Sequence, residues 1–468
     1  MPAIPLGIRD DGKYAALLDQ KAMWPWAVQR CQSIFPGLNV KDCVRPSPPP
    51  PPGKKEPDFG AVGLEGAALD DLKQTGWAIL FGPNTSPEIR KQLDPLIQFR
   101  KSEIDDPSLF KVWPDDEKKG GYQGGQSVDD WLGQFRVGSD TLVQPKAGVP
   151  YYVLIVASPE DIPFSFQYEL DVYWAVGRLW LEKDEDYGAY ARAVVAYEKA
   201  QQAAPTAKKL TYFAPNFARD NGATKLLCNG LVGPLRDRQL TAKFGFAEEF
   251  ITGADATRDR LVDLYSGTNG RAAIYFCGSH GLLRGFDSDF LEDTQGALLC
   301  ENWPGDTPPE KEQYMTGGDL RPESDLRGTM HFIFACYGGG WPSTSTYDGT
   351  PVAPKPMVAR LPQTILAKGG LAVLAHIDRV WSYSSQADNG IDRSGEIEDV
   401  LSRLMKGARA GHATDQFNTR WNVLGNSIAQ KIASHRMPST QTAHDLWIEH
   451  DDARNHVLYG DPAVCLRV

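Results

Sequence analysis

Residues 331–340 read HFIFACYGGG and place a cysteine at the end of a short, mainly apolar run. The run His331 to Ala335 is typical of a strand buried in a parallel sheet, because polar and apolar residues do not alternate in it. The three glycines after Tyr337 allow the backbone to turn sharply and expose its N–H groups. This stretch therefore predicts a buried strand that presents Cys336 at its carboxyl end.

A second stretch upstream has the same organisation. Residues 272–281 read AAIYFCGSHG, so an expected buried strand, 272–277, is followed directly by a turn that carries His280 between glycines. In parallel sheets, functional groups gather beyond the carboxyl ends of the strands. We therefore expect Cys336 and His280 to lie close together at one edge of a sheet.

The rest of the chain alternates apolar runs with helical patterns. Further strands are expected at 77–81, 151–157, 210–213, 370–376 and 463–468, and helices at 86–100, 187–203, 224–235, 256–265, 357–367, 397–404 and 415–432. Strands that alternate with helices are typical of an α/β fold with a mainly parallel sheet.

A cysteine and a histidine at neighbouring strand ends suit the hydrolysis of an amide bond. A thiolate attacks the carbonyl carbon, and an imidazolium supplies the proton that the leaving amine needs. The backbone N–H groups of Gly281 and Cys336 are candidate donors to the oxyanion that develops. Either residue alone is more often a core residue, so their joint placement carries the hypothesis.

At this point the sequence resembles a family. FCGSHG and IFACYGGG are similar to the His and Cys motifs of caspase-like (clan CD) cysteine peptidases, in particular the CHAT and gingipain-like branch. Four further stretches resemble elements of these proteins: 150–164, 170–180, 369–383 and 456–468. The resemblance covers about residues 77 to 468, and its motifs occur in the expected order.

The resemblance implies a caspase-like α/β/α sandwich with two side-by-side subdomains and the activity of a cysteine endopeptidase. It assigns His280 and Cys336 to the catalytic dyad, and Gly281 and Cys336 to the oxyanion hole. Asp171 takes the position of an acid that selects Arg or Lys before the cleaved bond, and Trp381 lies on a segment that contacts substrate.

Two features of the substrate-binding residues stay open at this stage. Asp171 is as easily a capping or turn residue, and Asp378 is then the reserve candidate for a basic substrate. The alternative is an apolar pocket lined by Trp381 and Tyr383, which selects Leu, Met or Phe.

Proline-rich sequence suggests the domain boundaries. Residues 1–53 form a lead-in that contains Trp24 and Trp26 and ends in a proline run, residues 54–250 an N-terminal α/β subdomain, and residues 251–468 the catalytic subdomain. Proline runs favour extended, semi-rigid linkers. We expect the lead-in and the loop 284–329 to restrain or shape the cleft rather than to build the sheet.

Composition narrows the function classes. The net charge of −11 and the pI near 5.3 disfavour non-specific nucleic-acid binding, which needs a basic surface. No apolar run is long enough for a membrane span, and the start has no apolar segment of a secretory signal. The seven cysteines contain no CxxC pair, so we expect no disulfide framework, a cytoplasmic location, and neither a metal nor a cofactor.

The remaining alternatives concern partners and chemistry. A protein or peptide is the expected substrate, and a regulatory partner protein is compatible with the long loops. We expect the acidic stretch at 287–293 to be a solvated loop, and a calcium site is the alternative interpretation. The same fold also suits a non-catalytic interaction module, or a hydrolase of small esters or amides.

Overall fold

A ten-stranded sheet organises the protein. The computed structural model describes residues 6–15, 68–138, 143–200, 206–220, 222–268, 270–305, 307–385, 393–433 and 440–467. In spatial order the strands are β3 (Phe110–Trp113), β2 (Trp77–Phe81), β4 (Tyr152–Val156), β5 (Ala175–Arg178), β16 (His456–Gly460), β15 (Ala372–His376), β12 (Met330–Phe334), β8 (Ala272–Gly278), β6 (Ala207–Ala214) and β7 (Ala247–Thr252). The structure confirms the α/β class with a mainly parallel sheet.

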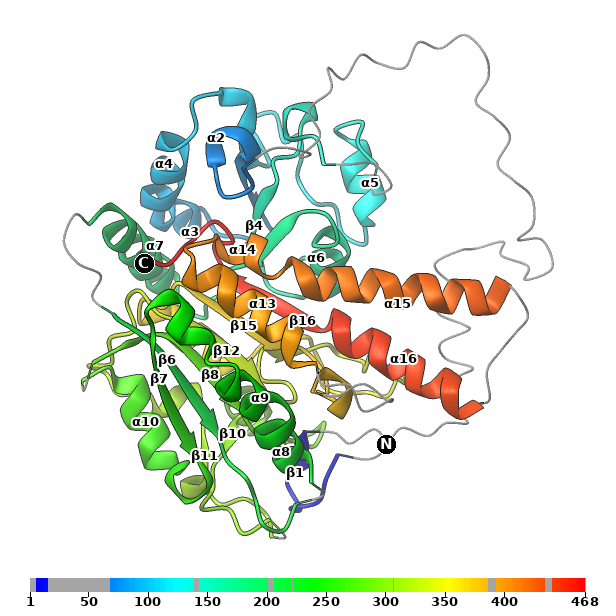
Figure 1. Cartoon of the computed structure of the whole chain (residues 1–468). Coiled ribbons are helices and arrows are strands. Elements are labelled where there is room, and N and C mark those ends of the chain that lie inside the picture. The colour runs from blue at the N-terminus through cyan, green and yellow to red at the C-terminus, as the bar shows by residue number, and fades with distance from the viewer. Residues whose placement is uncertain are drawn as a thin grey trace.

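The sheet consists of two halves that run in opposite directions. All neighbouring strands are parallel except β15 and β16, which are antiparallel. We call β3, β2, β4, β5 and β16 the first half-sheet, and β15, β12, β8, β6 and β7 the second half-sheet. Figure 1 shows the first half-sheet with its blue and cyan helices at the top and the green strands of the second half-sheet below.

Helices cover the sheet on both faces, because every residue of β4, β8 and β12 is buried. The helices are α2 (Leu72–Thr75), α3 (Pro87–Gln92), α4 (Asp94–Ser102), α5 (Val128–Gly133), α6 (Phe164–Leu170), α7 (Asp184–Lys199), α8 (Ala223–Leu226), α9 (Gly233–Asp237), α10 (Arg258–Ser266), α11 (Leu291–Thr294), α12 (Arg360–Ala367), α13 (Ser394–Met405), α14 (Ala410–Ala413), α15 (Asp415–Ala433) and α16 (Thr440–Arg454). The long helices α15 and α16 lie side by side (Figure 1). None of the helices in the described ranges has the length and apolar character that crossing a bilayer requires.

A second, small sheet lies beside the large one. Its strands are β1 (Gly7–Arg9), β9 (Gly281–Leu283), β10 (Leu298–Leu299) and β11 (Tyr314–Met315), in that order. A two-stranded ribbon, β13 (Gly340–Trp341) with β14 (Met357–Val358), follows β12. Trp24, Trp26 and the proline run at 46–52 lie outside the described residues.

Two expectations about the elements are corrected. The expected strand 463–468 is wrong, because the last described strand is β16, which Pro462 follows closely and which therefore ends before that segment. The expected helix 86–100 is two helices, since Pro95 has no N–H to donate to the carbonyl of Lys91. Both β6 and β7, which precede residue 253, belong to the second half-sheet.

A buried ion network holds the first half-sheet to its neighbours. Asp461, directly after β16, accepts hydrogen bonds from Trp77 Nε1 at 2.9 Å and from Arg100 Nε at 2.7 Å. Arg100 also pairs with Glu198 of α7 at 2.6 Å. The side chains of Arg100 and Asp461 are completely buried, so each charge depends on the other for its partner.

Candidate active site

The carboxyl ends of β8 and β12 meet at one edge of the second half-sheet. Gly278 pairs with Phe334 in the parallel register, and the Ser279 N–H donates to the Phe334 carbonyl at 3.1 Å. A Cβ added to Gly281 would lie 1.9 Å from the carbonyl oxygen of Cys336, so these two backbones are in direct contact. The structure thus brings the residues around His280 and Cys336 together, as their positions in the sequence predict.

A strained turn follows Cys336. Tyr337 has a φ of +56°, a left-handed conformation that is unusual for a side chain of this size. Its N–H donates to the carbonyl of Asp378 at 3.0 Å, and the N–H of Gly339 donates to that of His376 at 2.8 Å. These bonds tie the turn to the end of β15 and fix the direction of the Cys336 side chain.

The Cys336 thiol is completely buried. Burial raises its pKa, whereas the Val380 N–H, which donates to Sγ at 3.1 Å, and the nearby Arg379 guanidinium act in the opposite direction. In this arrangement the thiol is held protonated. Its environment nevertheless offers a hydrogen-bond donor and a positive charge to a thiolate once water reaches the site.

The first described residues of the chain cover Cys336. We call residues 6–15 the N-terminal hairpin: β1 pairs in parallel with β9, and Tyr14 forms a bridge back to Ile8. The backbone N–H groups of Gly281 and Cys336 both donate to the Leu6 carbonyl oxygen, at 3.0 and 3.4 Å. The Leu6 N–H donates to the carbonyl of Val380 at 2.9 Å. Two converging N–H groups therefore already hold a carbonyl oxygen beside the thiol.

His280 lies in an aromatic surround. Its ring centroid is 5.7 Å from that of Tyr14, 5.8 Å from that of Phe217 and 6.3 Å from that of Trp303. The imidazole is completely buried, and its Nδ1 makes no hydrogen bond to any described residue. A buried imidazole nitrogen without a partner is suited to a transient one, such as the amine of a leaving group.

Asp220 is a residue that the sequence reasoning missed. Its Oδ2 lies 3.4 Å from His280 Nε2, and its carboxylate accepts N–H bonds from Gly222 at 2.7 Å and Thr224 at 2.9 Å. Burial opposes ionisation of this carboxyl group, but the contacts with His280 and Thr224 outweigh burial and lower the pKa of Asp220. The signal available in the sequence was its place after the strand expected at 210–213, at the same kind of strand end as His280.

The structure does not bring Asp171 into this group. Asp171 precedes β5, and two strands, β16 and β15, stand between β5 and β12. Its carboxylate accepts the Val176 N–H at 2.8 Å. Burial and the nearby Asp415 raise the pKa of Asp171 to about 8, so it is neutral over most of the physiological range. A neutral carboxyl group in another half-sheet is not placed to select a basic substrate at Cys336.

Asp378 and Trp381 lie on the segment after β15, close to the Cys336 turn. The Asp378 carboxylate accepts the N–H groups of Arg379 at 2.7 Å and Thr346 at 2.8 Å, and its side chain is buried. Trp381 is also buried, and its ring centroid lies 5.8 Å from that of Tyr347. Both buried side chains hold this segment in place. The backbone of the segment contacts Leu6 through the Val380 carbonyl.

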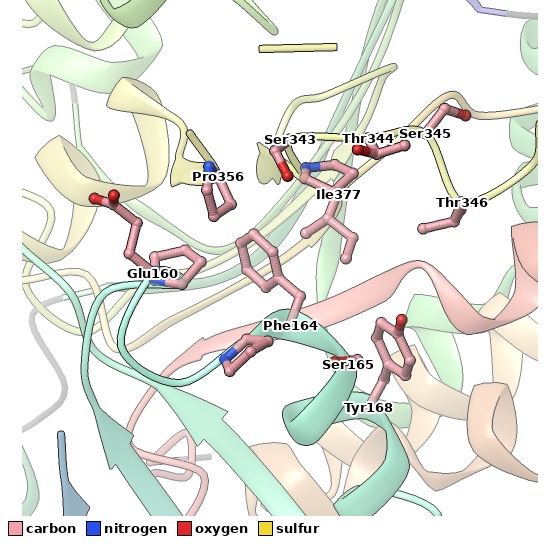
Figure 2. Close-up of a pocket in the computed structure, with 13 residues that line it drawn as sticks. Glu160, Phe164, Ser165, Tyr168, Ser343, Thr344, Ser345, Thr346, Pro356 and Ile377 are labelled. Carbon is pink, nitrogen blue, oxygen red and sulfur yellow. The ribbon is translucent and has the colours of Figure 1, made fainter. Parts of the chain in front are cut away.

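A pocket opens next to the Cys336 turn. Figure 2 shows Phe164, Ser165 and Tyr168 of α6 on one side and the loop 343–346 on the other, with Ile377 between them. The lining residues include neither Cys336 nor His280. The pocket and the thiol are therefore separate features.

Among the described residues, neither the Ser279 hydroxyl nor a group of metal-binding side chains adds to this site. The Ser279 hydroxyl donates to the Leu299 carbonyl at 2.5 Å, so it is committed to the backbone rather than to attack. Within the described ranges, no three His, Cys, Asp or Glu side chains are grouped so that they could hold a metal ion.

Comparison with known proteins gives distant structural similarity. No protein-family model matches the chain, and no curated protein sequence is significantly similar to it. The structure is similar to the Arg-specific cysteine proteinase gingipain R, with a TM-score of 0.49 and 12% identity over 84% of this chain and 78% of that one. A Saccharomyces cerevisiae separase–securin complex is similar with a TM-score of 0.33 and 10% identity over 71% of this chain and 17% of that one. Similarity of this degree does not bear on activity.

Proposed function

We propose that the protein is a caspase-like cysteine endopeptidase in which Cys336 is the nucleophile and His280 the proton donor. One observation carries the proposal: the N–H groups of Gly281 and Cys336 converge on a single peptide carbonyl oxygen next to the thiol. Donors in this arrangement stabilise the oxyanion that forms when a thiolate attacks that carbonyl.

The remaining residues of the site have supporting roles. Asp220 positions His280 and stabilises the positive charge of its imidazolium. Val380 donates to the Cys336 sulfur and accepts from the substrate backbone. Asp378 holds the segment that carries Val380, because its carboxylate accepts the backbone N–H groups of Arg379 and of Thr346 in a neighbouring loop.

Substrate preference follows from the same geometry. The expectation of a basic residue before the cleaved bond named Asp171 first, and Asp171 lies on the far side of two strands. The reserve candidate, Asp378, is buried, and its carboxylate accepts the N–H groups of Arg379 and Thr346. The apolar alternative fits better, because the residue now bound at this position is Leu6, with only 2% of its surface exposed.

Incubation with a peptide library tests the proposal. The full-length protein should cleave peptides internally, whereas Cys336→Ala and His280→Ala should give no products at unchanged melting temperature. Absence of cleavage by the parent would favour the non-catalytic interaction module. Hydrolysis of small esters without any peptide product would favour the smaller-substrate hydrolase.

A further inference from the structure

The N-terminal hairpin is bound in the manner of a substrate. The Leu6 carbonyl oxygen occupies the position between the two N–H donors, and the Leu6 N–H pairs with the Val380 carbonyl. On the other side of the Leu6–Gly7 bond, Gly7, Ile8 and Arg9 pair in register with Gly281, Leu282 and Leu283. The chain therefore crosses the site in an extended conformation, with backbone bonds on both sides of a single peptide bond.

Gly7 lies directly against the nucleophile. A Cβ added to Gly7 would lie 3.1 Å from Cys336 Sγ, 3.3 Å from Cys336 Cβ and 2.6 Å from Leu283 Cδ1. Any larger residue would push the backbone away from the thiol. The glycine is therefore what allows the peptide bond to approach Sγ this closely.

Two further contacts anchor the hairpin after this bond. Asp10 pairs with Arg284, and its other carboxylate oxygen accepts the Gly285 N–H at 3.1 Å. The Tyr14 hydroxyl donates to the Arg219 carbonyl at 3.3 Å, and the Tyr14 ring faces His280. These contacts place the hairpin through specific partners on the loops that surround the dyad.

We propose that the Leu6–Gly7 peptide bond is an intramolecular substrate of Cys336, so that the protein processes its own N-terminal segment after a leucine. The inference rests on the proposed peptidase function and adds the cleavage site and the residue accepted before it. The Leu6 side chain belongs to the main hydrophobic cluster of the core. A lysine or arginine there would bring a charge into this cluster.

The chemical step is balanced without a co-reactant other than water. The Cys336 thiol gives its proton to His280 and its sulfur bonds to the Leu6 carbonyl carbon. The bond from that carbon to the Gly7 nitrogen then breaks, and His280 passes the proton to the departing amine. Water then adds to the thioester, His280 takes up a proton from it, and the sulfur leaves. The products are a peptide that ends in the Leu6 carboxylate and a chain that begins at Gly7.

Intact-mass measurement and N-terminal sequencing of the full chain test the proposal. The parent should convert to a chain that begins Gly7-Ile8-Arg9, and Cys336→Ala should stay unprocessed. The rate constant should be unchanged over a tenfold dilution, since the bond and the thiol are in one chain. Processing of Cys336→Ala at the same rate, or a rate proportional to concentration, would overturn the proposal.

Variants of the hairpin test the leucine and the glycine. Leu6→Lys and Gly7→Val should each slow processing at least tenfold, the first through a buried charge and the second through contact with Leu283 and Cys336. Lys13→Ala is the matched control in the same hairpin, because the Lys13 side chain is 74% exposed, and it should process at the parent rate. Equal or faster processing of Leu6→Lys would overturn the preference for leucine.

A separate readout distinguishes failure of this inference from failure of the proposed function. A peptidyl acyloxymethyl ketone with leucine next to its reactive group should alkylate Cys336. In the Gly7→Val protein, Cys336 should be alkylated at least tenfold faster than it is in parent protein that has not yet been processed. If Cys336 is alkylated and library peptides are cleaved while Leu6–Gly7 stays intact, the inference fails and the peptidase stands. If neither alkylation nor any cleavage occurs, both fail.

Discussion

The two half-sheets have the same number of parallel strands but use their polar residues differently. In the second half-sheet, His280 and Cys336 follow β8 and β12 and lie at a site with unsatisfied bonding capacity, such as the free Nδ1 of His280 within the described structure. In the first half-sheet, the buried charges of Arg100 and Asp461 are fully paired. Unsatisfied groups are costly to stability, so the imidazole nitrogen of His280, unpaired among the described residues, sets this edge of the second half-sheet apart from the paired charges of Arg100 and Asp461.

Loss of the nucleophile should have the largest effect of the changes considered. Cys336→Ala should reduce peptide cleavage by roughly 10³-fold or more, because nucleophile and proton donor act as a unit. Cys277→Ala is the matched control, since Cys277 is a buried thiol on the neighbouring strand β8. Cleavage of a fluorogenic leucine peptide by the three proteins measures the effect. Similar losses in both variants would remove the distinction between the reactive and the structural thiol.

The corresponding change in the first half-sheet should affect folding and leave the chemistry intact. Asp461→Ala removes a partner of Arg100 and of the Trp77 indole, and breaking such a buried pair costs about 3–5 kcal/mol. The control Asp116→Ala removes an exposed carboxylate and should change the free energy of unfolding by less than about 0.5 kcal/mol. Urea denaturation measures both. An Asp461→Ala protein as stable as the control would show that the ion network is dispensable.

Asp220 should show an intermediate effect, confined to catalysis. Asp220→Asn should lower kcat roughly 10- to 100-fold with KM nearly unchanged, since the carboxylate acts through His280 rather than on substrate. Asp220→Glu should recover part of the loss. Steady-state kinetics on one leucine peptide gives both parameters. A change in KM alone would instead indicate that Asp220 contacts the substrate.

Substitution of Asp171 should change peptide cleavage least and should alter the pH dependence of stability instead. The pKa of Asp171 is raised to about 8 in the folded protein, from about 3.9 in an unfolded chain, so its contribution to stability is present below pH 4 and is lost as the pH rises to 8. Asp171→Asn does not titrate. The stability of the parent relative to Asp171→Asn should therefore fall between pH 4 and pH 8, by up to about 1.4 kcal/mol per pH unit.

Melting curves of both proteins at pH 5 and pH 8 measure this difference. Peptide cleavage by Asp171→Asn should stay within about twofold of the parent for leucine and arginine substrates alike. A selective loss of arginine cleavage would return Asp171 to the substrate site despite the two intervening strands.

The sequence predicts the central strands well, and it predicts that the segments carrying His280 and Cys336 meet at one edge of the sheet. Continuous apolar runs such as those of β4, β8 and β12 are fully buried, so pattern and structure agree. Short or partly exposed strands such as β5 and β7 do not give such a pattern. The order of strands in space is also not encoded locally, which is why the separation of Asp171 from Cys336 could not be foreseen.

The contacts of Leu6 and Asp220 show a second limit. Neither residue stands in a motif, and each acquires its role only because distant segments fold against it, Leu6 against Gly281 and Asp220 against His280. The sequence suggests that the lead-in and the loop 284–329 shape the cleft. It does not indicate which peptide bond lies over the thiol.

The position of β16 has a consequence for the time course of folding. β16 is the last described strand in the chain, yet it lies in the middle of the sheet, between β5 and β15. During synthesis the strands before it can assemble as two separate units, and only the late arrival of residues 456–460 joins them. Because β16 pairs Tyr459 with Arg178, far away in the sequence, this joining step has a high contact order and should be slow. We therefore expect the strands around the thiol to be assembled before the sheet as a whole is closed.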